Sequence, residues 1–301
     1  MDRLRALSVF VAVAETSGFA AAGRKLGMSP PSVTRIMSGL EAELGAQLAL
    51  RTTRSVTLTD AGKRYYEDAK RILADLEEAD RQAAGRHAAP RGKVTITASS
   101  LFGRKVVAPA LFDLLDAYPE ITVSTLFVDR VTHLVDEGID IAVRIADLPD
   151  SSMIATRVGA VRRVLCASPD YLKRRGHPNS PTDLINHHAI RFLSASASNA
   201  WALQVNGESI DVDPPSRLFT NTADVAIAAA IAGRGVTRVL SYQIADEVAE
   251  GKLTRILDEY APPPVPVHVV HRETGIVSAR VRAVVDFLAA ELRRAPVLRE
   301  G

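Results

Sequence analysis

The segment from Ser17 to Gly62 constrains the fold of this chain more than any other feature. Its sequence predicts two short helices, a tight turn between them and a basic hairpin after the second. We expect Ser17-Gly18 to stop one helix and start the next, because serine is a good N-cap. Gly27 supplies the left-handed residue of the turn, and Ser29 caps the second helix with Pro30 at its first position. This order predicts a winged helix-turn-helix.

The second predicted helix has two distinct faces. Val33, Met37, Leu40 and Leu44 recur every three or four residues and predict a buried stripe. The opposite face carries short hydroxyl side chains and an arginine, which suit base edges and phosphates. A basic tip follows, before an alternating strand over residues 56–59. We therefore expect DNA contacts from Ser29, Pro30, Pro31, Ser32, Thr34, Arg35, Arg51, Thr53 and Arg54.

Each part of this pattern has a plainer interpretation when it is taken alone. A helix–glycine–helix joint is usually simple packing, and the sequence RTTR at 51–54 is usually a solvated turn. The ordered combination carries the prediction. Charge agrees with it: the chain has a formal net charge of +2, but residues 1–64 hold nine Lys or Arg against five Asp or Glu.

The same residues resemble the N-terminal signature of LysR-type transcriptional regulators. The framework is SGFAAA at 17–22, LGMSP at 26–30, LEAELG at 40–45 and LTDAG at 58–62. Ala49 departs from the family, whose members usually carry Leu or Phe under the wing, which implies looser packing there. Pro31-Ser32 replaces a familiar Ser-Ala pair, which implies altered base contacts. The resemblance implies a sequence-specific DNA-binding regulator controlled by a small-molecule effector.

Composition excludes several other classes of protein. The chain has 301 residues, 47% of them hydrophobic, and lacks a run of about 18 apolar residues, the length of a membrane span. The N-terminus lacks a small-residue cleavage site, so we expect no signal peptide and a cytoplasmic protein. The single cysteine, Cys166, excludes an intrachain disulfide and a multi-cysteine metal site. Its apolar surroundings predict a buried structural thiol.

A long helix is predicted from Asp60 to about Arg86, where the sequence has no proline. A narrow apolar seam with charged flanks favours a two-helix coiled coil. An amphipathic helix packed on its own domain is the alternative. In the LysR family such a helix pairs two DNA-binding domains, so the resemblance implies a homodimer or homotetramer on a promoter dyad. The seam consists of Tyr66, Ala69, Leu73, Leu76 and Asp80.

The remaining sequence predicts two α/β lobes after a break at 88–92. Strands are expected at 94–98, 121–128 and 139–145, with helices at 103–117 and 130–137, which predicts a parallel sheet. The chain is expected to return to this lobe through 265–271 and a final helix at 277–294, after a stiff connector at Pro262–Pro264. The predicted fold class is α/β: a winged helix-turn-helix (1–59), a linker helix (60–89) and an effector domain (90–301), with lobe I at about 90–163 and 265–301 and lobe II at about 164–264.

The second half also resembles the LysR family, whose effector domain is similar to periplasmic binding proteins. The matching stretches include GKVTITAS at 92–99, YPEI at 118–121, ASPDYL at 167–172 and SARVRAVVDFL at 278–288. Ligands of such folds bind outside the carboxyl ends of the strands. Carried over from the family's cleft, the expected effector contacts are Ser99, Ser100, Phe102, Thr125, Phe127, Val128, Arg144, Ile145, Asn221 and Thr222.

These residues suggest a carboxylate or similar small anion as effector, because serines, an arginine and helix N-termini favour negative charge. Other roles stay open: each serine as a plain helix cap, Arg144 paired with Asp140 or Asp147, and Phe102 and Phe127 in the core. No cofactor or metal is expected, because His177, His187 and His188 lack metal-ligand spacing. Gly233-Arg234-Gly235 ends a helix, so it does not predict a phosphate-binding loop.

Rival classes of function remain at this stage. An enzyme acting in the cleft is disfavoured, because the sequence has no G-x-S-x-G elbow and suggests no catalytic set. A pure solute-binding module is disfavoured by the N-terminal segment. A different winged-helix family with an unrelated sensor is the narrower alternative.

Overall fold

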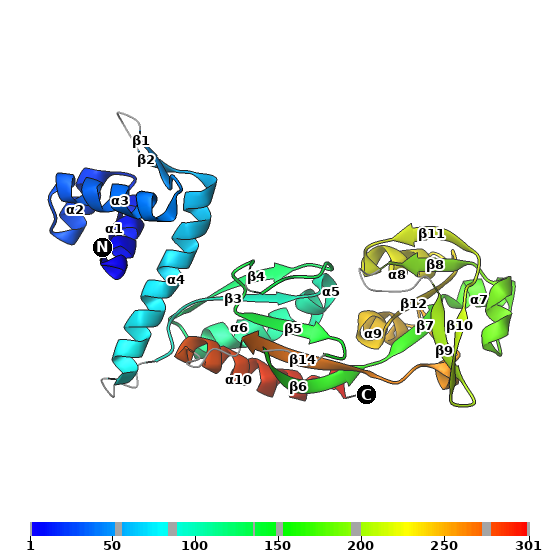
Figure 1. Cartoon of the computed structure of the whole chain (residues 1–301). Helices are drawn as coiled ribbons and strands as arrows, with labels where there is room; N and C mark the ends of the chain where they lie inside the picture. The colour runs from blue at the N-terminus through cyan, green and yellow to red at the C-terminus, as the bar shows by residue number, and fades with distance from the viewer. Residues whose placement is uncertain are drawn as a thin grey trace. The chain divides into compact units, whose positions relative to one another are not determined.

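The computed structural model describes residues 2–51, 56–83, 89–134, 136–148, 153–193, 200–272 and 278–299 (Figure 1). The chain divides into two compact units, residues 1–88 and residues 89–301. Within the described ranges, no helix combines the length and apolar character needed to cross a membrane.

The first unit is a helix-turn-helix with a short antiparallel hairpin. Gly27 and Gly45 end the second and third helices with φ values of +65° and +64°, so the left-handed turn expected at Gly27 is confirmed. The prediction that Ser17-Gly18 stops one helix and starts the next is confirmed, although the N-cap of α2 is Gly18 and not the serine. Ser17 ends the first helix with φ +50°, its carbonyl accepts the N–H of Val56, and Gly18 is the N-cap. The elements are α1 (Arg3–Thr16), α2 (Phe19–Leu26), α3 (Pro30–Leu44), β1 (Ala49–Arg51), β2 (Val56–Leu58) and α4 (Asp60–Ala83).

The core of this unit contains the apolar stripe predicted for α3. Val33, Met37 and Leu40 have no exposed surface, whereas Leu44 is partly buried at the edge of the cluster. The ring of Phe10 lies 5.4 Å from that of Tyr65 on α4, between ring centroids. The first half of α4 therefore packs on its own unit, which stabilises the position of α3.

The first sheet of the second unit has the strand order β4-β3-β5-β14-β6. Strand β3 is parallel to β4 and β5, as predicted, but β14 pairs antiparallel with both β5 and β6. The return of the chain to this sheet is confirmed by β14 and the helix after it. The strands are β3 (Gly92–Ala98), β4 (Ile121–Phe127), β5 (Ile141–Ile145), β6 (Met153–Val161) and β14 (Val265–Arg272); the helices are α5 (Ser100–Phe102), the π-helix η1 (Gly103–Val107), α6 (Ala108–Ala117), α10 (Ala279–Arg294) and η5 (Pro296–Leu298).

The helix predicted at 130–137 is wrong: the described residues of this segment form bends and turns. The two terminal nitrogens of Arg130, Nη1 and Nη2, donate to the Glu137 carboxylate at 2.8 and 2.5 Å. The backbone N–H of His133 donates to the same carboxylate at 3.1 Å. These hydrogen bonds hold the pKa of Glu137 at about 2, with Arg130 as the main cause. The segment closes around the Glu137 carboxylate, and these side-chain bonds compete with a continuous helix, of which one i→i−4 bond, from Glu137 N–H to the His133 carbonyl, is present.

The second sheet has the strand order β11-β8-β12-β7-β13 and carries a separate antiparallel hairpin, β9–β10. Strands β11, β8 and β12 are parallel to one another. The strands are β7 (Arg163–Ala167), β8 (Ala189–Phe192), β9 (Trp201–Val205), β10 (Glu208–Val212), β11 (Ser216–Thr220), β12 (Val236–Leu240) and β13 (Thr254–Ile256); the helices are α7 (Pro169–Arg175), η2 (Pro181–Asn186), α8 (Ala223–Ile231), η3 (Ser241–Ile244), α9 (Ala245–Ala249) and η4 (Asp258–Tyr260).

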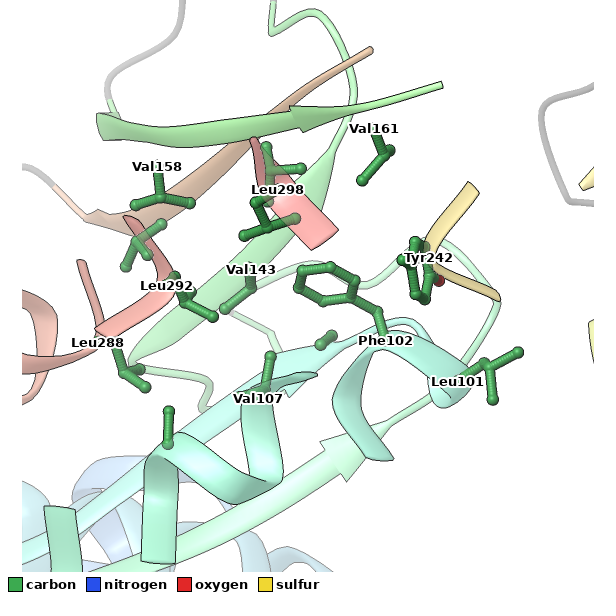
Figure 2. Packing of buried hydrophobic residues seen from close by; sticks show 14 of the residues in the cluster. Leu101, Phe102, Val107, Val143, Val158, Val161, Tyr242, Leu288, Leu292 and Leu298 are labelled. Carbon is green, nitrogen blue, oxygen red and sulfur yellow. The ribbon is translucent and has the colours of Figure 1, made fainter. Parts of the chain in front are cut away.

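One hydrophobic cluster contains residues of both sheets of the second unit. Figure 2 shows Phe102 of α5 and Tyr242 of η3 in this cluster, with the Phe102 ring toward Val143 and Leu298. The two rings are 5.0 Å apart and perpendicular, at 89°. The chain passes from β6 to β7 at Arg162, whose backbone exchanges two hydrogen bonds with Ser241. Cys166 is fully buried in the same cluster, and burial raises its pKa to about 12, which confirms the predicted buried thiol.

Candidate nucleic-acid interface and ligand site

The N-terminal half of α3 presents the residues predicted to contact DNA. Ser29 is the N-cap of the helix by its backbone angles, but its hydroxyl pairs with the hydroxyl of Ser32 at 2.8 Å. Pro31 and Arg35 are exposed and lie about one helical turn apart. In the described part of the chain, Arg35 has no hydrogen bond or ion pair. Ser29 and Pro30 are exposed as well, whereas Ser32 and Thr34 are half-buried.

Close packing at two glycines fixes this helix and the hairpin after it. A Cβ atom at Gly23 would lie 2.6 Å from the carbonyl oxygen of Met28, in the turn between α2 and α3. A Cβ atom at Gly62 would lie 2.0 Å from the carbonyl oxygen of Leu48. Contacts this short against backbone leave no room for a side chain. Gly23 therefore lets α2 pack closely on the turn before α3, and Gly62 lets the start of α4 pack closely on the segment around Leu48.

Glu41 holds the hairpin against α3, a role that sequence reasoning missed. Its carboxylate accepts the backbone N–H groups of Leu48 at 2.8 Å and Ala49 at 3.1 Å. Ala49, the residue at which this chain departs from the family pattern, is buried. Among the predicted wing contacts, Arg51 belongs to β1 but its side chain is not described. Thr53 and Arg54 lie outside the described residues.

The effector residues predicted in the first sheet lie at the carboxyl ends of its parallel strands. Ala98 is paired with Phe127 and Thr97 with Ala142, so the residues that follow β3, β4 and β5 share one edge. Val128 donates its N–H to Ala98, and Ile145 is half-buried against the core. Thr125 is exposed on β4. Phe127 is half-buried over Gly103, where a Cβ atom would lie 2.3 Å from its ring.

The polar groups at this edge already bond to one another. The N–H of Ser100 donates to the carboxylate of Asp129 at 3.0 Å, so a carboxylate already occupies the start of this helical segment. Arg144 donates to the carbonyl oxygen of Thr132 at 2.7 Å and to its hydroxyl at 3.2 Å. Asp129 directly follows the strand predicted at 121–128, and this position after a strand end is the signal that could have identified it.

Tyr242 of the second sheet's η3 completes this cluster. The side-chain amide of Gln243 donates to the Tyr242 hydroxyl at 3.3 Å, and burial raises the pKa of Tyr242 to about 12, so the phenol stays protonated. Phe102 is fully buried against the same ring. Core packing, one of the two roles open from the sequence, therefore describes Phe102 in this structure. The sequence offered no signal for Tyr242, because its aromatic partner Phe102 lies more than a hundred residues away.

Asn221 and Thr222 lie at the carboxyl end of β11. Thr222 is the N-cap of α8, its N–H bonds to the hydroxyl of Thr220 at 3.2 Å, and Asn221 is exposed. Arg104 of η1 forms an ion pair with Asp224, in the first turn of α8, at 2.8 Å. This ion pair joins the segment that begins at Ser99 to the helix that begins after Thr222. The structure thus connects the clusters predicted in both sheets.

The histidines considered as metal ligands have other surroundings. In the described ranges, no group of three or more His, Cys, Asp or Glu side chains is arranged to hold a metal ion. The Nδ1 atom of His187 bonds to the Tyr171 hydroxyl at 3.2 Å, and His188 Nε2 lies 3.2 Å from Arg175. His177 is exposed.

Comparison with protein families gives two matches that together span most of the chain. Residues 4–63 match the family described as bacterial regulatory helix-turn-helix protein, lysR family. Residues 87–293 match the LysR substrate binding domain.

Individual proteins agree with these matches. An HTH-type transcriptional repressor of Pseudomonas aeruginosa (strain UCBPP-PA14) is 33% identical over 290 residues, which cover 96% of this chain and 92% of that protein. The HTH-type transcriptional activator AaeR of Escherichia coli (strain K12) is 31% identical over 96% of this chain and 93% of its own length. The structure of CrgA, a LysR-type transcriptional regulator from Neisseria meningitidis, has a TM-score of 0.62 and 29% identity, covering 96% of this chain and 98% of that chain.

Proposed function

Because the chain belongs to the LysR family of transcriptional regulators, we propose that it binds a promoter dyad through α3 and changes its DNA binding when a small molecule binds its α/β domain. The observation that carries the DNA-binding half is the exposed N-terminal half of α3. Its outward groups are short hydroxyls, two prolines and one arginine, on a helix fixed by a buried apolar stripe.

In the proposed complex α3 enters the major groove. Arg35 contacts base edges, and Ser32 and Thr34 contribute short hydrogen bonds to bases or phosphates. Ser29, Pro30 and Pro31 lie at the helix start, where the N–H groups and the helix dipole favour a phosphate. Arg51, Thr53 and Arg54 of the wing contact phosphates or the adjacent minor groove.

The proposed effector site comprises Ser99, Ser100, Thr125, Arg144, Asn221 and Thr222, with Phe127, Val128 and Ile145 beside them. We propose a small carboxylate as the effector. Because the carboxylate of Asp129 already accepts the N–H of Ser100, an effector carboxylate at this point has to displace it. A ligand shifts an equilibrium only by its difference in affinity for the two states, and displacement of Asp129 supplies such a difference.

The proposed assembly is a homodimer or homotetramer joined through α4. Ile72 and Leu76 on the second half of this helix are 42% and 37% exposed, large values for apolar side chains on a helix. Burial of these two side chains against a partner helix would remove apolar surface from water. Gel filtration tests the assembly, because a mass near the 32.4 kDa of one chain would refute it.

The proposed domain boundaries are 1–59 for the DNA-binding domain, 60–89 for the linker helix and 90–301 for the effector domain. We place the protein in the cytoplasm, where a DNA-binding regulator acts. The relatives are named transcriptional regulators and not enzymes, and they include a repressor and an activator. We therefore propose no catalytic role for the α/β domain.

The decisive experiment is footprinting of the purified protein on the DNA upstream of its own gene, at several salt concentrations. We expect protection of a dyad with steep salt dependence. The variant Arg35→Ala is expected to lose about 1–3 kcal/mol of binding free energy and to relax specificity at one base position. Arg54→Ala is expected to weaken binding to all sequences and to lower the salt slope by about one.

The matched control is Arg282→Ala, which removes an exposed arginine from α10 in the other unit. It should leave the footprint unchanged. Equal affinity for the upstream DNA and for random DNA, followed by failure of random-site selection to enrich any sequence, would refute the DNA-binding proposal.

A further inference from the structure

A strongly basic cavity lies in the second sheet's part of the α/β unit. It has a volume of about 250 Å³ and is lined by Arg174, Arg175, Arg217, Arg234 and His188, with Tyr171 and Gly233 completing the wall. No carboxylate is among these lining residues. Four guanidinium groups around one cavity repel one another unless an anion lies between them.

The cavity lies at the opposite end of the sheet from the proposed effector residues. His188 directly precedes β8, Arg217 is at the start of β11, and Arg234 precedes β12. These three strands are parallel, so the cavity is at their amino ends, whereas Asn221 and Thr222 follow the carboxyl end of β11. The nine-residue helix α8 runs from Thr222 to the cavity, a length of about 14 Å. The cavity is therefore a separate site.

Two of the arginines, Arg174 and Arg175, form hydrogen bonds with the protein. Arg174 donates to the carbonyl oxygen of Gly233 at 3.1 Å. Gly233 has φ +68°, and a Cβ atom there would lie 2.8 Å from the Arg174 guanidinium, so a glycine keeps this space open. Arg217 and Arg234 are exposed and have no hydrogen bond or ion pair among the described residues. The cavity thus combines positioned and unoccupied donors.

His188 also lines the cavity, and one of its ring nitrogens is buried without a hydrogen-bond partner among the described residues. Arginine can only donate, so Nε2 of His188 accepts the hydrogen bond from Arg175, and the proton of the neutral ring is on Nδ1. That Nδ1 atom is buried without a hydrogen-bond partner in the described part of the chain. A buried donor left without a partner is costly and is rare in folded proteins.

The backbone N–H groups of Gly233 and Arg234 are not available to a ligand in the cavity. The N–H of Gly233 donates to Ala230 and that of Arg234 donates to Ala229, both at 3.0 Å, so these groups are used by the end of α8. This agrees with the absence of a phosphate-loop pattern in the sequence. Recognition has to come from the arginine side chains.

We propose that this cavity binds a small free anion carrying one or two phosphate groups. The planar guanidinium group donates two parallel hydrogen bonds to phosphate oxygens, and Arg217 and Arg234 have these donors available. The proposal goes beyond DNA binding and beyond the proposed effector site, because it needs neither α3 nor Ser99 and Ser100. Binding would act on the end of α8 through Arg174, whose guanidinium holds the carbonyl of Gly233.

Isothermal titration of the full chain with inorganic pyrophosphate tests this proposal, at constant ionic strength and without DNA. We expect saturable binding, weakened about tenfold in Arg217→Gln and in Arg234→Gln, as expected for the loss of a charged hydrogen-bond donor. Arg282→Gln makes the same change of charge on α10 and should bind as wild type does. Arg35→Ala should also bind as wild type does, which separates this site from the DNA-binding surface.

Three outcomes would overturn the proposal. Wild type that shows no saturable binding has no such site. Equal affinities for Arg217→Gln, Arg234→Gln and Arg282→Gln would mean general charge attraction. Weaker duplex binding by Arg217→Gln, without any pyrophosphate binding, would assign these arginines to DNA phosphates. Without anion, Arg217→Gln and Arg234→Gln should unfold at the wild-type temperature or slightly above it, because these arginines have no partner in the described structure and their loss relieves charge repulsion.

Discussion

The N-terminal half of α3 and the proposed effector residues differ in how far the protein itself occupies their polar groups. On α3, Arg35 is exposed and has no partner among the described residues. At the ends of β3 and β5, Ser100 bonds to Asp129 and Arg144 bonds to Thr132. The surface proposed for DNA is ready to bind, whereas the site proposed for the effector is closed by its own hydrogen bonds.

This difference fits the two tasks. A surface that binds a rigid, highly charged duplex gains most when its donors are already positioned and exposed. A site that signals has to change when its ligand arrives, and a ligand that replaces internal bonds makes the bound state different from the free state. The following predictions break one side of this comparison at a time, with Trp201 as a reporter of the second unit only.

The largest effect is expected from Gly62→Ala. A Cβ atom at Gly62 would lie 2.0 Å from the backbone oxygen of Leu48, so the hairpin or α4 has to move. We expect the first unit to lose more than about 3 kcal/mol of stability, although alanine favours a helix. Fluorescence anisotropy should show loss of duplex binding. The chain's only tryptophan, Trp201, is buried in β9, so its fluorescence unfolding midpoint should be unchanged.

Gly18→Ala is the matched control in the same unit. A Cβ atom there has its nearest contact at 3.7 Å, an ordinary distance, so the cost should be below about 1 kcal/mol even at an N-cap. If Gly18→Ala and Gly62→Ala lost duplex binding equally, the close packing at Gly62 would not be what fixes the surface.

Gly103→Ala should produce the next largest effect, in the other unit. Its Cβ atom would lie 2.3 Å from the ring of Phe127, a side chain that can shift, so we expect a loss of about 1–3 kcal/mol. The Trp201 unfolding midpoint should fall while duplex affinity stays within about threefold, below the roughly 1 kcal/mol typical of a lost contact. An unchanged unfolding midpoint would show that the Phe127 ring shifts at no cost and does not stabilise the proposed effector residues at the strand ends.

Asp129→Asn should open the effector site without removing its hydrogen bond. Asparagine still accepts from Ser100 but lacks the charge that repels a carboxylate, so acetate or benzoate should bind about tenfold more tightly. Thermal shift against carboxylate concentration measures the change. Asp116→Asn, which changes an exposed residue of α6, is the control and should leave carboxylate binding unchanged. Weaker carboxylate binding by Asp129→Asn would contradict displacement of Asp129.

The smallest effect concerns His187, a buried residue whose Nδ1 atom already bonds to the Tyr171 hydroxyl, just as the polar groups of the proposed effector site bond within the protein. Burial lowers the pKa of His187 below its ordinary value of 6.5, helped by the charge of Arg175. Between the lowered pKa and 6.5 the unfolded chain binds more protons, so the free energy of unfolding falls as pH falls below 6.5.

The thermal unfolding midpoint followed by Trp201 fluorescence should therefore fall by up to about 4 °C when the pH is lowered from 7.5 to below 6.5. His187→Asn should remove this part of the drop, since asparagine accepts from Tyr171 and does not titrate there. An identical pH profile in the variant would show that His187 does not contribute.

The elements that the sequence predicted correctly depend on local signals. Val33, Met37 and Leu40 repeat with the helical period, and Gly27 allows a left-handed turn, so α3 and its start follow from the chain's own preferences. Asn206-Gly207 carries an equally local signal for the β9–β10 turn, with φ values of 53° and 85°, although the hairpin was not predicted. The segment 130–137 failed because Arg130 and Glu137 bond to each other across it.

The sequence by itself determined the winged helix-turn-helix and the α/β class, because periodicity, caps and turn residues act within a few positions. Only the tertiary structure decided which polar groups pair or lie together: Ser100 with Asp129, Arg104 with Asp224, Glu41 with the wing, and the arginines around the basic cavity. A hydrogen bond forms only within about 3 Å, and partners that are distant in sequence reach that distance only after the sheets have packed.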